Sequence, residues 1–235
     1  MTFDLAYDEY WVAENIFYRV DFEKFSGMID PDVDTAIRFH PSEELKMLLD
    51  AIHEHQAKYP AYMPAYALEM QILVSERRGE IPPLRKSDIR ETYISITREQ
   101  ITVREKGAPE RFVIVEHTKT YKDRRYPRTE AVNEFLPRLY DILEKYYPDS
   151  EFLFPADTEN GTITNNMVYQ FYSRTCKKLG IKISRDVVKG PHSFRRNAIT
   201  DVVNASGGDT TLAAELYGNS QEVAKKNYYT GIDEE

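Results

Sequence analysis

Apolar side chains recur every three or four positions along most of the chain, which is the spacing of one face of an α-helix. The pattern is clearest in a largely polar stretch where Val132, Phe135, Leu136 and Leu139 share one face. A helix also begins at Ser42, a capping residue followed by two glutamates that suit the positive end of a helix dipole. The other predicted helices span residues 7–20, 62–78, 130–146, 166–179, 191–205, 210–217 and 220–229. Gly79 and the prolines after it are expected to end the helix at 62–78.

The middle of the chain changes to a period of two. Segments 92–97, 101–104 and 111–117 alternate apolar and polar residues and are rich in Ile, Val and Tyr, as β-strands are. Residues 106–109 supply a turn between the last two segments. We therefore predict a mainly α-helical fold of the α+β class with a small three-stranded antiparallel sheet, and a short apolar element at 152–155.

Composition bounds the class of protein. At 235 residues, with 41% hydrophobic and 30% charged residues, the chain can build one substantial core with a small appended segment. We expect neither a membrane span nor a signal peptide, because there is no long apolar run and no basic start. Cys176 is the only cysteine, which excludes an internal disulfide, fits a reducing cytoplasm and favours a buried structural thiol over a nucleophile.

The net charge of −8 is unevenly distributed. Residues 1–60 hold 13 acidic and 5 basic side chains, so the rest of the chain is neutral overall. Within that neutral part, segments 117–128 and 174–196 are strongly basic. Phosphate binding depends on local potential, so these two patches are compatible with nucleic acid. The residues expected to contact DNA are Lys122, Arg124, Arg125, Arg174, Lys177, Lys178 and Arg196.

The most informative motif joins His192, Arg195 and Tyr228. The first two lie three positions apart, so a helix places them on one face. A guanidinium binds phosphate oxygens with paired hydrogen bonds, and an imidazole exchanges a proton near neutral pH. A tyrosine brought to that face could attack a phosphodiester and hold it covalently.

Three further segments fit the same chemistry. Arg77 begins the pattern R-x-x-E-x-x-x-L-x-x-x-D-I, in which Glu80 can hold the arginine by a charge-assisted bond. Lys119 lies in Thr-Lys-Thr after the predicted strands, and Asn219 ends a Leu-Tyr-Gly-Asn segment nine positions before Tyr228. In this order and spacing, residues 40–230 resemble the tyrosine recombinase (phage integrase) family.

The resemblance implies the fold of that family's catalytic domain over residues 41–235, with the lysine at the sheet edge. In the family an N-terminal helical domain clasps DNA on the opposite side, and residues 1–40 are expected to be a linker or a remnant of it. The implied reaction is DNA cleavage and rejoining: Tyr228 attacks the scissile phosphate, giving a 3′-phosphotyrosyl link and a free 5′-hydroxyl. Because bond energy is stored in the phosphotyrosine, neither a cofactor nor a metal is implied.

The resemblance also assigns roles. Arg77 and Arg195 neutralise the non-bridging oxygens, and His192 takes the tyrosine proton. Lys119 protonates the leaving oxygen, because an ammonium on a flexible stem can reach it. The remaining roles fall to Asn219, an uncharged donor where the family usually has His or Trp, and to Glu80, which orients Arg77.

Implied partners are double-stranded DNA and further copies of the chain, as a tetramer on DNA and a monomer in free solution. The resemblance implies a cytoplasmic protein of bacterial, phage or mobile-element origin. The chief competing residues are Arg78, Lys122 and Tyr229, each close to the residue it would replace. Two other functions stay open: a type IB topoisomerase, and a catalytically silent DNA-binding relative, which Asn219 and the acidic start favour.

Overall fold

The computed structural model describes residues 40–183, 189–219 and 221. All of the described residues belong to one unit of the chain, Ala36–Glu235. The helix predicted at 7–20 and nearly all of the one predicted at 220–229 lie outside the described residues. In the described part, no helix has the length and apolar character needed to cross a membrane.

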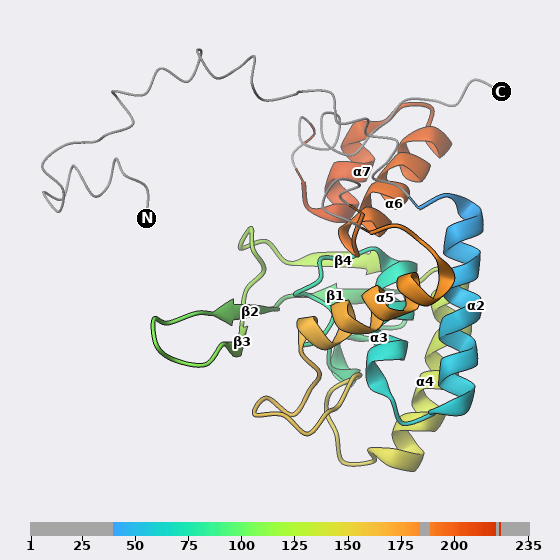
Figure 1. The fold of residues 1–235 in the computed structure, drawn as a ribbon. Coiled ribbons are helices and arrows are strands. Elements are labelled where there is room, and N and C mark those ends of the chain that lie inside the picture. The colour runs from blue at the N-terminus through green and yellow to red at the C-terminus, as the bar shows by residue number, and fades with distance from the viewer. Residues whose placement is uncertain (1–39, 184–188, 220, 222–235) are drawn as a thin grey trace, which may run out of the picture. The chain divides into compact units, whose positions relative to one another are not determined.

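Helix α3 (Met63–Val74) lies at the centre of the helical packing (Figure 1). It contacts α2 (Ser42–Lys58), α4 (Glu130–Tyr146) and α5 (Asn165–Leu179). Nearly every residue of α3 is buried, as expected for a helix that is mainly apolar around its circumference, and its two polar residues, Glu69 and Gln71, are buried as well. The core is therefore built around the helix that leads directly into Arg77.

Two helices begin at threonine caps. Helix α4 has its predicted bounds, and the Thr129 hydroxyl caps it by accepting from the Val132 amide at 3.4 Å. Helix α5 begins one residue before its predicted start, where Thr164 accepts from the Met167 amide at 3.2 Å. The two glutamates after Ser42 lie in the first turn of α2, although Ser42 is the first helical residue and not the cap.

The end of α3 corrects the sequence prediction. The helix ends at Val74, because Ser75 adopts a left-handed conformation with φ of 51° and its hydroxyl donates to the Ile72 carbonyl at 3.1 Å. Residues 76–78 are therefore not helical, and Gly79 does not terminate the helix. Serine seldom adopts this conformation, so the sequence carried no signal for the earlier end.

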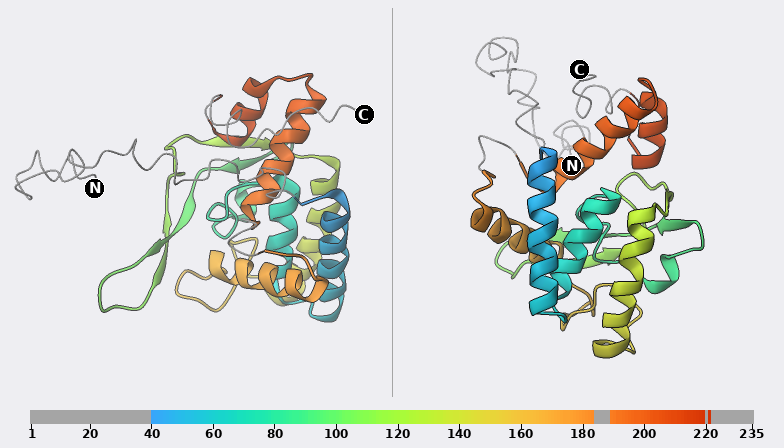
Figure 2. Two further views of the ribbon diagram at one scale, coloured as in Figure 1. Left: turned by 45° about the horizontal axis from the view of Figure 1, so that its top comes forward. Right: turned by 90° about the vertical axis from the view of Figure 1, so that its right-hand side faces the viewer.

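The predicted three-stranded sheet is wrong. Strand β1 (Tyr93–Ile96) pairs with β4 (Arg124–Pro127), and β2 (Glu99–Val103) pairs with β3 (Arg111–Val115), so the described strands form two antiparallel pairs. Strand β4 was not predicted, since two arginines and a proline in four residues are not typical of a strand. Figure 2 shows β2 and β3 extending away from the helices, while β1 and β4 lie against them.

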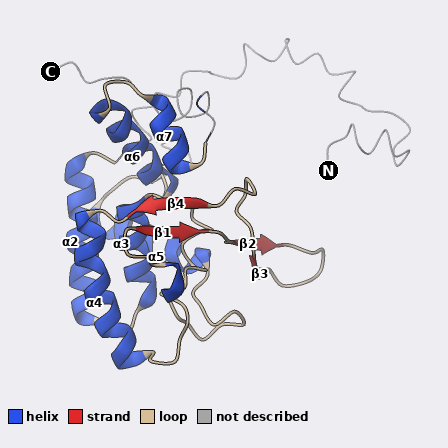
Figure 3. Cartoon of the chain, turned by 180° about the vertical axis from the view of Figure 1, so that it is seen from behind, coloured by secondary structure: helices blue, strands red, loops and turns tan. Residues whose placement is uncertain are grey.

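Helices α6 (His192–Ala205) and α7 (Thr210–Tyr217) pack against each other, and α7 also packs on β4. Both follow the predicted bounds closely, and the view from behind in Figure 3 shows them grouped beyond β4. The buried His40 fastens α6 to the start of α2, because Asn197 donates to its carbonyl at 2.7 Å. The fold thus brings α6, α7 and β4 to the residues that follow α3.

The structure agrees with the structural role predicted for the only cysteine, Cys176. Cys176 lies on the inner face of α5 and is buried. Burial raises its pKa to about 11, so the reactive thiolate is scarce at neutral pH.

Candidate active site

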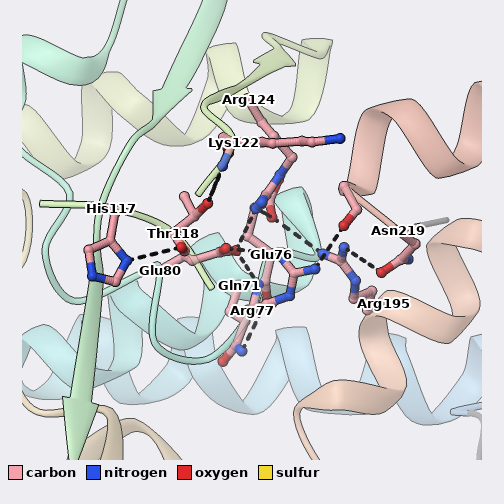
Figure 4. A network of polar contacts seen from close by, with 11 residues as sticks. Gln71, Glu76, Arg77, Glu80, His117, Thr118, Lys122, Arg124, Arg195 and Asn219 are labelled. Atoms are coloured by element: carbon pink, nitrogen blue, oxygen red, sulfur yellow. Dashed lines mark hydrogen bonds and ion pairs between the residues drawn. The ribbon is translucent and has the colours of Figure 1, made fainter. Parts of the chain in front are cut away.

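Arg77 lies just beyond the end of α3, where the turn at Ser75 directs it toward the start of the loop after α7. Its guanidinium donates to Glu80 Oε1 at 3.1 Å through Nη1 and to the Gly218 carbonyl at 2.9 Å through Nη2. Its backbone N–H also donates to Glu80 Oε2, at 2.9 Å. The contact suggested by the R-x-x-E spacing is therefore present, and a second contact ties Arg77 to the end of α7 (Figure 4).

Arg124 also binds Glu80. Its Nη2 atom donates to Glu80 Oε2 at 2.7 Å and to Glu76 Oε2 at 2.6 Å, so two carboxylates converge on one guanidinium nitrogen. Burial by itself would raise the pKa of Glu80, but the charge of Arg124 and hydrogen bonds from Glu76 and Arg124 outweigh it and lower that pKa. Glu80 is therefore ionised at neutral pH.

Arg195 reaches the same cluster from α6 and is almost fully buried, with 1% of its surface exposed. Its Nη1 atom donates to Glu76 Oε2 at 3.3 Å and its Nη2 atom to Asn219 Oδ1 at 3.4 Å. The guanidinium carbon also lies 5.2 Å from the ring centre of Tyr217. This aromatic face stabilises the buried cation.

Glu76 is a site residue that the sequence reasoning missed. It precedes Arg77 directly, and its side chain is buried between Arg124 and Arg195. Burial is the largest cause of a pKa raised to about 7; the neighbouring Glu80 raises it as well, while the two arginines oppose the shift. The available signal was a glutamate two residues after the end of a mainly apolar helix, because such a residue faces either solvent or a buried partner.

His192 begins α6 and keeps an exposed edge. Loss of hydration is the largest cause of its lowered pKa, followed by the positive charges of Arg195, Arg196, Arg77 and Lys119, and the value falls to about 4. The imidazole is therefore neutral at physiological pH, so it can accept a proton. The same effect shows that the four cations lie near one imidazole.

Lys119 is exposed in the connection between β3 and β4 and not in the β2–β3 hairpin. The buried Thr118 shapes this connection: its hydroxyl donates to the Lys122 carbonyl at 2.9 Å, closing a tight loop. Lys122 is also exposed, so both candidate lysines keep mobile stems. The charge of Lys119 is among those that lower the pKa of His192.

Asn219 completes the cluster from the end of α7. Gly218 ends the helix in the left-handed conformation, with φ of 61°. The backbone N–H of Asn219 then donates to the Ala214 carbonyl at 3.0 Å. The side-chain nitrogen Nδ2 of Asn219 is buried, and no hydrogen-bond partner for it occurs in the described part of the chain. The same holds, within that part, for Arg195 Nε and for Arg124 Nε and Nη1. Such a group of donors without acceptors suits an anion.

The other predicted DNA contacts are placed in two regions. Arg124 is buried in the cluster, whereas Arg125 is exposed beside the Tyr93 ring, 5.0 Å from its centre. Lys177 is exposed on α5, and Arg174 and Lys178 line a cavity of about 840 Å³ with the end of α2, apart from the arginine cluster. Arg196 follows Arg195 on α6 and is partly exposed. Arg78, the competitor of Arg77, is exposed beside Tyr169, while Tyr228 and Tyr229 lie outside the described residues.

This fold defines a class of protein of which several structures have been solved. The integrase of the Tn1549 transposon, in complex with a circular intermediate DNA, superposes with a TM-score of 0.67 at 18% identity, over 97% of this chain and 71% of that one. The XerH site-specific recombinase bound to its difH substrate gives 0.52 at 18% identity, over 80% and 49%. A lambda integrase dimer bound to a core site gives 0.56 at 15% identity, over 84% and 50%.

The fold is that of the catalytic domain of tyrosine recombinases. The chain belongs to the phage integrase family, whose model matches residues 38–235. It spans about half the length of the XerH and lambda integrase chains. None of the curated protein sequences compared with it matches.

Proposed function

We propose that this protein is a site-specific DNA recombinase that cleaves and rejoins DNA through a 3′-phosphotyrosyl intermediate. The observation that carries the proposal is the convergence of Arg77, Arg195 and Asn219 from three segments of the chain: Arg195 donates to the Asn219 side chain, and Arg77 donates to the carbonyl of the preceding Gly218. Unpaired donors of Arg195 and Asn219 remain there, buried and without acceptors in the described part. A phosphodiester would supply those acceptors.

The first step is attack by the Tyr228 oxygen on the scissile phosphorus. A bond forms between phenol oxygen and phosphorus, and the bond from phosphorus to the 5′-oxygen breaks. Charge builds on the two non-bridging oxygens as the transition state becomes pentavalent, and the guanidinium groups of Arg77 and Arg195 offset it. The rejoining step reverses these events with the 5′-hydroxyl of a partner strand.

Two proton transfers accompany this step. Phenol has an ordinary pKa of about 10, so it must lose its proton to a neighbour. His192 is neutral at physiological pH and is the acceptor in this scheme. The leaving 5′-oxygen takes a proton from Lys119, because the exposed side chain of this lysine is long enough to bring its ammonium group to that oxygen.

The partners follow from the same chemistry. We propose that the chain binds double-stranded DNA, with Arg125, Lys122 and Arg196 beside the cluster as contacts to the backbone phosphates. We further propose that it assembles as a tetramer on DNA, and that residues 1–40 link the catalytic domain to a DNA clasp or are a remnant of one.

A covalent-capture experiment tests the function without a known target. Protein is incubated with nicked duplexes that carry a randomised core, and DNA that stays bound in strong detergent is sequenced. We expect enrichment of one core sequence and adducts linked through the 3′-phosphate of the cleaved strand, with a free 5′-hydroxyl on the downstream fragment of that same strand. Binding without any adduct would identify a silent relative, and relaxation of supercoiled plasmid without strand exchange would identify a topoisomerase.

A further inference from the structure

Glu76 occupies a place in the cluster that the proposed reaction does not use. Its side chain is surrounded by charged and phenolic groups from four separate parts of the chain. The groups that face it are Glu80, Arg124 and Tyr126 from the loop after α3 and from β4, Arg195 from α6, and Tyr217 from α7. Its second oxygen, Oε1, is buried without a partner in the described part of the chain.

The two arginines that Glu76 contacts differ in what else holds them. Arg124 also binds Glu80 at 2.7 Å, so its charge is compensated whether or not Glu76 is ionised. Arg195 has no other carboxylate among its hydrogen-bond partners in the described residues, and its contact to Glu76 is the longer of the two, at 3.3 Å. The ionisation of Glu76 therefore changes mainly the charge that Arg195 can offer to a phosphate.

We propose that Glu76 is a positioning residue that controls the availability of Arg195: when neutral it releases the guanidinium to the scissile phosphate, and when ionised it retains it. This inference rests on the proposed function of the site. Glu76 does not touch the reacting atoms and acts only through Arg195.

The electrostatics of the pocket support this role. Burial and the adjacent Glu80 raise the pKa of Glu76 to about 7, so both forms are present near neutral pH. A phosphate beside Arg195 adds negative charge and favours the neutral form further. Substrate binding should therefore be accompanied by proton uptake, and the ionised form should dominate in the free protein only at alkaline pH.

Glu76→Gln removes the ionisation and keeps the size of the side chain. We would measure adduct formation by the parent and the variant on the captured duplex from about pH 6 to 9. The quantity of interest is the rate of the variant divided by the rate of the parent, in which pH effects common to both proteins cancel. The ratio should be flat at low pH and rise about tenfold per pH unit above about 7. Glu69→Gln is the matched control, because Glu69 is a buried acid held by Arg138 and Gln56 away from this cluster.

The outcomes separate the two proposals. A flat ratio, or a variant that folds but is slow at every pH, overturns the role of Glu76 and leaves the recombinase function standing. Absence of adduct from the parent at every pH overturns the proposed function, and this inference with it. Should Glu76→Gln fail to fold, binding of the captured duplex to the parent near pH 7.5 is measured calorimetrically in two buffers of different ionisation enthalpy. Proton uptake supports the role, and its absence contradicts it.

Discussion

At the scale of single residues, the Asn219 side chain combines an acceptor and a donor. Its oxygen accepts from Arg195, its nitrogen has no hydrogen-bond partner in the described part of the chain, and we propose that this nitrogen donates to a substrate oxygen. Asn219→Ala should therefore slow adduct formation by about a hundredfold, the usual cost of losing a transition-state donor.

Asn219→His should form adduct at least as fast as the parent, since an imidazole donates with or without positive charge. Rates on the captured duplex provide the test. A loss of about a hundredfold or more in the histidine variant would mean that the pocket is built around the shape of the amide.

The role of Lys119 as the general acid can be tested by changing the leaving group of the DNA substrate. Replacing the bridging 5′-oxygen by sulfur gives a thiolate leaving group that needs no proton. Lys119→Ala should be badly impaired on normal DNA yet recover most of its cleavage rate on the sulfur-substituted strand. Arg195→Ala should show no recovery, since non-bridging oxygens are unchanged. Rescue of Lys122→Ala instead would transfer the acid role to that neighbouring residue.

At the scale of elements, the end of α7 is built against β4. A Cβ on Gly218 would lie 2.5 Å from Arg124 Cδ, and Arg124 cannot move away while Glu76 and Glu80 hold its far end. Gly180 ends α5 with a similar φ of 74° but has open space around it. Both sites favour glycine, and only one of them supports the candidate active site.

Substituting alanine at each of the two glycines separates the effect of a positive φ, which both share, from the effect of the contact with Arg124, which only Gly218 makes. Gly180→Ala should cost about 1 kcal/mol of unfolding free energy and leave adduct formation unchanged. Gly218→Ala should cost at least about 1 kcal/mol more and slow adduct formation, because it displaces Arg124 and the carbonyl that binds Arg77. Urea unfolding and adduct rates measure both effects. Equal behaviour of the two variants would contradict the account of the α7–β4 junction.

The elements that the sequence predicted well are those whose signals are local. Helix α4 has a clear apolar face and a threonine cap, so both of its ends could be read from neighbouring residues. The end of α3 and the strand β4 depend on tertiary contacts: Ser75 is held in a left-handed conformation, and β4 pairs with a strand from much earlier in the chain. Local patterns carry no information about such partners.

The candidate site divides in the same way. Motif spacing selected Arg77, Glu80, Arg195 and Asn219, and the fold brings these four together. Glu76 and the buried position of Arg124 were missed, because nothing in the sequence shows which charges face each other across α3, β4 and α6. Arg124 in particular was grouped with the exposed basic residues of its segment.

At the scale of the whole molecule, the buried Glu76 should make the stability of the fold depend on pH. Its pKa is 4.5 in an ordinary setting and about 7 in the folded protein. The folded chain thus keeps a proton that the unfolded chain releases. The stability contributed by the protonated group is complete below about pH 4.5 and is lost as the pH rises toward 7.

Comparison with Glu76→Gln isolates this effect. Urea unfolding of both proteins between about pH 4 and 8 should show the stability of the parent, relative to the variant, falling by about 3 kcal/mol. The change should be complete near pH 7. A constant difference over that interval would mean that Glu76 is ionised throughout.

The central claim is that Tyr228 carries the DNA. The direct test is mass spectrometry of the peptide that remains linked to nucleotide after nuclease digestion of the captured adduct. The account predicts the nucleotide on Tyr228, no adduct from Tyr228→Phe although DNA binding and folding persist, and normal adduct from Tyr229→Phe. A nucleotide on Tyr229, or an adduct that survives in Tyr228→Phe, would contradict it.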